Sequence, residues 1–163
     1  MENNRQKIDY SGRTVDLLLL KTVLNVPAVN QRVSLDADGS PMVVTGIEKM
    51  VQRFAIAFIN AMGSTKFCPG HGTRLVPRVS AGLVYDMATL EADASEANLL
   101  AWQQVSKADN MEDDTPDDER LVSSEVVGLE FSRSKSRIKI SIKLVSAAGD
   151  SYVYIIPVDV GVH

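Results

Sequence analysis

The sequence predicts an α+β fold in which helices gather on one face of a small antiparallel sheet. Two observations lead to this prediction. An apolar segment with helical spacing runs from about residue 46 to 62, and three runs with strict two-residue alternation fill the C-terminal third. Such runs, joined by short polar connections, are typical of an antiparallel meander with one packed and one wet face.

The first forty-five residues predict little regular structure apart from one hairpin. Residues 1 to about 13 are polar, and we expect them to be mobile. Residues 14–23 hold four consecutive leucines, and their periodicity leaves a buried strand and a single helical turn both open. Residues 32–35 and 41–45 flank Asp38-Gly39, a pair that favours a hairpin turn.

A long buried helix is predicted next, over residues 46–62. Its apolar residues share one side at helical spacing: Ile47, Met50, Val51, Phe54, Ala55, Phe58 and Met62. The first turns are expected to be kept wet by four polar residues: Glu48, Lys49, Gln52 and Arg53. Gly63 is the expected C-cap, because glycine enters the left-handed conformation without steric cost.

Residues 63–82 are predicted to form one long loop, since they hold four glycines and two prolines. Loops of that length inside a compact domain are usually functional or bound to a partner. Two helices are expected after it. The first is marked by Leu83, Met87 and Leu90, and the second begins at a capping box of Asp93 and Glu96 and runs to about Lys107.

Three residues of the second helix are expected to face inward: Leu99, Leu100 and Val105. Trp102 fits either the core or an interface, and the core is favoured. Residues 108–119 form an acidic run whose like charges repel one another, so ordered structure is not expected there.

The meander closes the chain, with strands predicted near 122–132, 137–146 and 151–159. Pro157 cannot donate to a ladder, which places the last strand at an edge of the sheet. We interpret residues 1–30 as an N-terminal extension and residues 31–163 as a single domain.

The composition of the chain restricts the classes of protein to which it can belong. Of the 163 residues, 45% are hydrophobic and 23% charged, as in ordinary globular proteins. The net charge of −4 and the pI of about 5.2 offer no basic face for nucleic acid. The single cysteine, Cys68, excludes an intrachain disulfide, and no stretch is long enough for a membrane span or a signal peptide. We therefore expect a soluble protein made in the cytoplasm.

The order of residues between Thr45 and Leu75 resembles the baseplate wedge family of contractile tails. That family, often labelled lysozyme-like in T-even phages, includes the matching subunit of type VI secretion systems. The shared pattern is a glycine, a long helix with an early glutamine, a second glycine, and a loop with an aromatic, a proline and Gly-Thr-x-Leu. It is carried here by Gly46, Gln52, Gly63, Phe67, Pro69, Gly72, Thr73 and Leu75.

A second feature of that family lies just before the predicted meander. Relatives in secretion systems have a Glu-Pro-Arg triplet there, which implies docking onto wedge partners. This chain has Asp118, Glu119 and Arg120, so the arginine matches and the proline position holds a glutamate. Arg120 is therefore a candidate bidentate contact at an interface, and a surface ion pair is the alternative.

Catalytic chemistry is weakly supported by the sequence. A glycosidase needs two carboxyl groups about 5 to 9.5 Å apart with one in an apolar pocket, and the acidic run gives no reason for any carboxyl to leave water. The spacing Cys68-Pro-Gly-His71 resembles half of a zinc site, but the only other histidine is His163. Pro69, Gly70 and Gly72 instead indicate a shaped loop whose backbone meets a neighbour closely.

The resemblance implies a structural subunit of a contractile phage tail baseplate, with no catalytic activity, no cofactor and no metal. It implies six copies around the central hub and spike, contacts with other wedge subunits, and a platform for the first ring of tail sheath protein. It implies assembly into the virion tail in the bacterial cytoplasm, without contacts to nucleic acid or membrane. The alternatives are a peptidoglycan hydrolase of a tail and a generic α+β adaptor.

Overall fold

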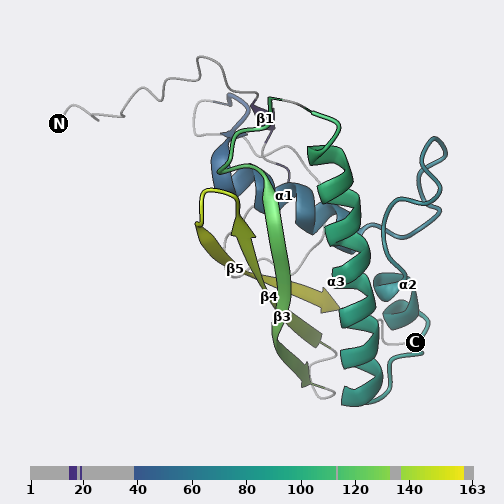
Figure 1. Ribbon diagram of the computed structural model, residues 1–163. Coiled ribbons are helices and arrows are strands. Elements are labelled where there is room, and N and C mark those ends of the chain that lie inside the picture. The colour runs from purple at the N-terminus through teal and green to yellow at the C-terminus, as the bar shows by residue number, and fades with distance from the viewer. Residues whose placement is uncertain (1–14, 18, 20–38, 113, 133–136, 160–163) are drawn as a thin grey trace.

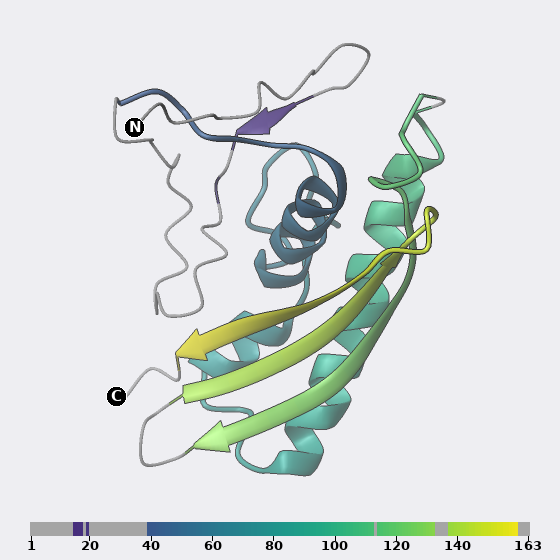
Figure 2. The same ribbon diagram turned by 90° about the vertical axis from the view of Figure 1, so that its left-hand side faces the viewer.

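Three antiparallel strands form the main sheet, in the order β3-β4-β5. They are β3 (Leu121–Ser132), β4 (Arg137–Ser146) and β5 (Ser151–Asp159), which confirms the predicted meander almost residue for residue. The computed structural model describes residues 15–17, 19, 39–112, 114–132 and 137–159. Figure 2 shows the three long strands side by side with the helices behind them.

Alternation along β4 fixes which face of the sheet is buried. Four of its apolar side chains are fully buried: Ile138, Ile140, Ile142 and Leu144. Lys139 and Lys143, between them, are exposed. Pro157 lies in β5, which pairs with β4 alone among the described strands, so its predicted place on an edge strand is confirmed.

Helix α1 (Gly46–Ile59) is the predicted buried helix, and it ends three residues earlier than expected. Phe54 and Phe58 stack with ring centroids 6.0 Å apart and are fully buried. Gly63 is not its C-cap. The chain leaves the helix at Asn60 in an extended conformation, because the next residue, Ala61, pairs with Thr73 in a parallel bridge.

The expected wet start of α1 is wrong for two residues. Lys49 and Gln52 are both buried. Each points at a polar partner from a distant part of the chain, so burial does not leave them unsatisfied. Sequence periodicity could not reveal these partners, since they lie 70 and 35 positions away.

A short ribbon lies beside α1. Strand β1 (Asp16–Leu17) pairs antiparallel with β2 (Val43–Val44). Residues 41–45, the second arm of the expected hairpin, contain β2 and therefore pair with β1. The first arm, residues 32–35, lies outside the described residues. For residues 16–17, the structure decides between the two alternatives in favour of a strand.

The predicted loop at 63–82 contains a helix, α2 (Leu75–Ser80). Leu75 and Val79 are buried in the core and stabilise this turn and a half of helix despite Pro77. Pro77 is tolerated because it lies in the first turn, where its missing N–H has no helical partner. The long loop is thus shorter than expected and ends at residue 74.

A single helix, α3 (Met87–Asp109), replaces the two that were expected. Its N-cap is Asp86, whose carboxylate accepts from the Thr89 N–H at 2.7 Å. Asp93 is not a cap, because it lies within the helix and pairs with Arg78 of α2 at 2.7 Å. Alanine makes up half of the buried side: Leu90, Ala94, Ala97, Ala101, Val105 and Asp109.

Leu99 is exposed, contrary to its predicted inward position, Leu100 is half-buried, and Val105 is buried as predicted. The helices form one layer against the sheet, as the sequence predicts. α3 packs on β3 and on α1, and one cluster of buried side chains joins all three. Within the described ranges, none of the helices combines the length and apolarity needed to cross a membrane.

Candidate functional site

A loop from Ala61 to Thr73 stands away from the helices on a base of backbone hydrogen bonds (Figure 1). The Met62 N–H donates to the Thr73 carbonyl at 2.9 Å, and the Thr73 N–H donates to the Asn60 carbonyl at 2.7 Å. The Thr73 hydroxyl, fully buried, donates to the Phe58 carbonyl at 2.7 Å. These bonds fix both ends of the loop to the last turn of α1.

Gly72 makes this base possible. Its φ of +100° is unfavourable for other residues, and a Cβ atom there would lie 2.5 Å from the Asn60 carbonyl oxygen. The side chain of Gln104 on α3 bonds both backbone groups of Gly72. Its Oε1 accepts from the Gly72 N–H at 2.9 Å, and its Nε2 donates to the Gly72 carbonyl at 3.0 Å.

The tip of the loop is exposed throughout residues 63–70. Phe67 is 90% exposed, and Pro69 lies two residues away. The chain turns tightly there, since the His71 N–H donates to the Cys68 carbonyl at 2.9 Å. The tip therefore presents an aromatic side chain to solvent, above a base that is fixed by backbone hydrogen bonds.

The structure divides the loop residues singled out by sequence. Phe67 and Pro69 lie at the surface, whereas Gly72, Thr73 and Leu75 belong to the base and the core. The close backbone approach expected between Gly72 and a neighbouring protein is made to Asn60 of the same chain.

The segment around Asp118, Glu119 and Arg120 is ordered, which corrects the expectation of a wet, unstructured run. Glu119 is 1% exposed. Its Oε2 lies 2.8 Å from Lys49 Nζ, and its Oε1 accepts from the Gly46 N–H at 3.0 Å. The carboxylate therefore binds the positive end of the α1 dipole as well as a lysine.

Arg120 is not a solvated surface residue either. Its guanidinium donates to the Thr115 carbonyl at 3.1 Å, and its own carbonyl accepts from the Ala147 N–H at 2.9 Å. The Nε atom is buried without a hydrogen-bond partner in the described part of the chain. Asp118, beside it, is half-buried.

A second buried ion pair was not anticipated from sequence. Arg53 on α1 lies 2.6 Å from Asp109 Oδ1, and the other oxygen of Asp109 accepts from the Leu121 N–H at 2.9 Å. The last residue of α3 thus connects α1 to the first residue of β3. Only the charge of these residues was visible in the sequence, and their pairing depends on the fold.

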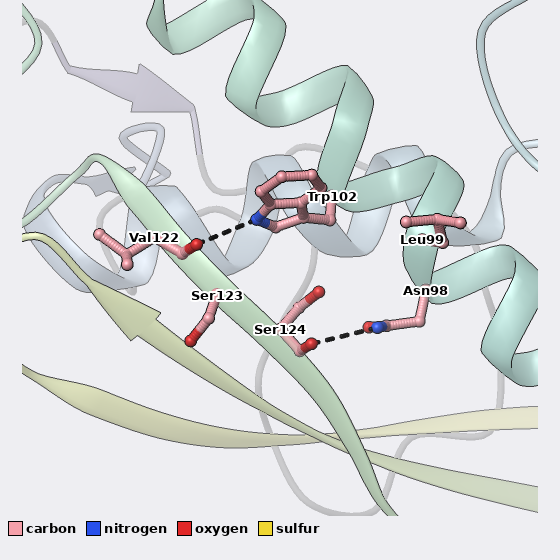
Figure 3. Close-up of a pocket in the computed structure, with 6 residues that line it drawn as sticks. All are labelled: Asn98, Leu99, Trp102, Val122, Ser123 and Ser124. Atoms are coloured by element: carbon pink, nitrogen blue, oxygen red, sulfur yellow. Dashed lines mark hydrogen bonds between the residues drawn. The ribbon is translucent and has the colours of Figure 1, made fainter.

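Trp102 and Asn98 of α3 occupy the free edge of β3 (Figure 3). The indole N–H donates to the Val122 carbonyl at 3.1 Å, and Asn98 Nδ2 donates to the Ser124 carbonyl at 3.2 Å. Trp102 is half-buried and packs against the edge of the core cluster, so it is neither a fully buried core residue nor a fully exposed one. These side chains obstruct a strand that would pair with the start of β3.

Groups suited to catalysis are engaged in structure. Glu119 and Asp109, the two buried acidic residues of the described ranges, each contact a cation and a backbone N–H. Cys68 is a free, exposed thiol. Among the described residues, no group of three or more His, Cys, Asp and Glu side chains is placed to hold a metal ion.

Two pKa shifts accompany the packing. The hydrogen bond and charge of Asp93 raise the pKa of Arg78. Burial, with a smaller contribution from Tyr152, raises the pKa of Tyr154 on the inner face of β5. Neither residue lies in the loop from Ala61 to Thr73, so these shifts do not suggest a reaction there.

Comparisons with known proteins add a fold likeness. No protein-family model matches the chain, and no curated protein matches it significantly. A solved structure with a similar fold is that of a Geobacter sulfurreducens protein provisionally named a tail lysozyme, with 18% identity and a TM-score of 0.49. The match covers 74% of this chain and 97% of that one. At this level of similarity, we draw no conclusion about activity from it.

Proposed function

We propose that this protein is a non-enzymatic structural subunit of a contractile phage tail baseplate. The observation that carries the proposal is the loop from Ala61 to Thr73. Its sequence contributes most of the resemblance to the baseplate wedge family, and its tip holds Phe67 90% exposed above a rigid base. Aromatic side chains are enriched among the residues that protein interfaces bury, so we propose that a partner covers Phe67.

The proposed partners are the other wedge subunits around the central hub and spike, with six copies in each baseplate. The tip of the loop would contact a wedge partner. The first ring of sheath protein would assemble on the same subunit through strand addition to the meander. Trp102 and Asn98 obstruct β3 at Val122 and Ser124, so β5 is the edge we propose for an incoming strand.

We propose the absence of hydrolase activity because a glycosidase acid must be neutral in an apolar pocket. Glu119 and Asp109 are the buried carboxyl groups in the part of the chain that the structure describes, and each lies against a cation. Both carboxyl groups are thus occupied by structural contacts, whereas a general acid must lie within hydrogen-bond reach of a substrate.

Co-expression with the products of neighbouring genes tests the proposal directly. If those genes encode tail proteins, the chain should co-purify with them as a complex on size-exclusion chromatography. Phe67→Ala should lower the recovery of that complex at least tenfold, a typical loss for a buried aromatic anchor. Its melting temperature should stay unchanged, since the ring makes no core contact.

Met111→Ala is the matched control, because Met111 is also a large exposed apolar residue but lies outside the loop. It should leave recovery at the level of the wild type. Equal recovery with Phe67→Ala would remove the loop from the interface. Cleavage of purified cell walls that one Asp or Glu substitution abolishes would favour the hydrolase. Arg120→Ala is a poorer probe, because its guanidinium holds the Thr115 carbonyl.

A further inference from the structure

Gln52 holds a piece of extended chain in the way that a neighbouring strand would. Its side chain is buried on α1, with Nε2 donating to the Leu17 carbonyl at 2.9 Å and Oε1 accepting from the Leu19 N–H at 2.8 Å. A donor and an acceptor are thus presented to residues i and i+2 of one extended segment. This is the pattern of backbone groups that one side of a strand offers.

The opposite side of the same segment is held by β2. Asp16 pairs with Val44 and Leu17 pairs with Val43 in antiparallel register. Figure 2 shows the short β1 arrow beside β2 and near α1, away from the three-stranded sheet. Gln52 and β2 therefore form a site for an extended backbone, and β1 and Leu19 occupy it.

Recognition at this site depends on backbone groups more than on side chains. Val15 and Leu17 are each 46% exposed, and Val43 beside them is exposed as well. A ribbon with two residues in each strand is marginal without further support. The attachment of β1 and Leu19 consequently relies on a few hydrogen bonds that another copy of the same segment would form equally well.

We propose that the segment carrying β1 and Leu19 is an exchangeable arm, which binds the Gln52 and β2 site of a second copy of this chain. Exchange of an identical element between copies keeps every contact and is a low-cost route to association. The exposed strip of Val15, Leu17 and Val43 gives two such copies an apolar surface to share. High local concentration of the chain favours exchange over binding within one copy. The inference does not depend on the proposed function.

Cysteine cross-linking tests arm exchange in the full chain. Leu17 and Val43 are direct register partners, so a cysteine pair at these positions has suitable geometry for a disulfide. Cys68→Ser provides the background, since Cys68 is free and exposed. Chains with Leu17→Cys alone are mixed with chains with Val43→Cys alone and oxidised gently. A covalent heterodimer is expected, and its yield should rise with protein concentration.

Val153→Cys replaces Val43→Cys in the matched control mixture, because Val153 is similarly exposed but lies on β5. Leu19→Pro removes the N–H that Gln52 accepts, and Gln52→Ala removes both bonds. Either change should lower the heterodimer yield about tenfold, the loss expected for one or two hydrogen bonds. Circular dichroism of both variants checks that they still fold.

The double variant with Leu17→Cys and Val43→Cys in one chain shows whether the pair can close at all. If it closes within a single chain while the mixed single variants give no more dimer than the Val153→Cys control, the arm binds only in its own copy and the proposal is wrong. A dimer yield that neither Leu19→Pro nor Gln52→Ala lowers would also contradict it.

Discussion

Gln104 bonds both backbone groups of Gly72, and Gln52 bonds the carbonyl of Leu17 and the N–H of Leu19. Each amide replaces a strand partner that the fold does not supply. A buried amide must bond on both sides, because an unsatisfied polar group costs about 1–3 kcal/mol. Two irregular segments are thereby fixed to helices, and substitutions at these points should affect stability more than their loop positions suggest.

Gly72→Ala should lower the free energy of unfolding by about 2 kcal/mol or more. The new Cβ would meet the Asn60 carbonyl oxygen at 2.5 Å, and the backbone φ of +100° is itself strained for alanine. Gly70→Ala is the control, because a Cβ there meets nothing within 4 Å. Urea unfolding of the two variants measures the difference. Equal stability of both would show that the loop base relaxes freely.

Lys49→Met should destabilise the fold by about 3–5 kcal/mol, since it leaves the Glu119 carboxylate buried without its cation. The double variant Lys49→Met with Glu119→Gln should recover most of that loss, because glutamine is neutral and still accepts from the Gly46 N–H. Thermal unfolding of the single and double variants gives the comparison. Additive losses would mean that the two charges act independently.

Pairs such as Lys49 with Glu119 explain where sequence reasoning failed. The two residues are separated by 70 positions, and each follows residues that suggest a solvated surface. Sequence predicts that a charge is costly to bury but does not reveal the opposite charge that the fold brings to it. The candidate loop was located from sequence for the opposite reason: its glycines, its proline and its single aromatic residue are all local signals.

At the scale of the element, α3 and the meander contrast in how far sequence predicts them. The two-residue period of a strand is visible in the sequence of β4, because every second residue from Ile138 to Leu144 is large and apolar. The buried side of α3 is instead built around Ala94, Ala97 and Ala101, which permit close approach to α1 and β3. Alanine carries little hydrophobic signal, so the more apolar Leu99 was expected inside although it is exposed.

Ala97→Leu should cost about 1–3 kcal/mol of stability, because the added carbons have no free volume in a packed core. Ala92→Leu, on the exposed side of the same helix, should change stability by less than about 0.5 kcal/mol. Melting temperatures measured side by side distinguish these outcomes. A tolerated Ala97→Leu would reveal an unfilled space between α3 and the sheet.

Loss of the Tyr154 proton should lower the stability of the fold at alkaline pH. Burial raises the pKa of its phenol above the unfolded value, so the folded state binds this proton more tightly. The stabilisation is fully present below the unfolded pKa and is lost as pH rises through the folded pKa. Tyr154→Phe should therefore reduce the loss of melting temperature as the pH rises above about 10. An unchanged pH profile would show that Tyr154 stays protonated or becomes solvated.

At the scale of the whole molecule, one buried cluster joins α1, α3 and the three-stranded sheet. Ion pairs cross the same boundaries, since Arg53 binds Asp109 and Lys49 binds Glu119. A chain with a single core and such cross-connections should unfold in one cooperative step. The alternative is two units, α1 with the β1 and β2 ribbon and α3 with the meander, that separate before either unfolds.

Trp102 tests this cooperativity, because it is the only tryptophan and its indole bonds the Val122 carbonyl of β3. Its fluorescence reports separation of α3 from the sheet, whereas far-ultraviolet circular dichroism reports all helices together. Urea curves from the two signals should coincide, with one midpoint and one slope. If α1, α3 and the sheet unfold together, Arg53→Met should shift both curves by the same amount, because the ion pair with Asp109 then stabilises the whole cooperative unit. The native fluorescence of Trp102 could instead persist at urea concentrations where α1 has already unfolded. That result would show that α3 and the sheet stay packed without α1, and that the molecule consists of two cooperative units.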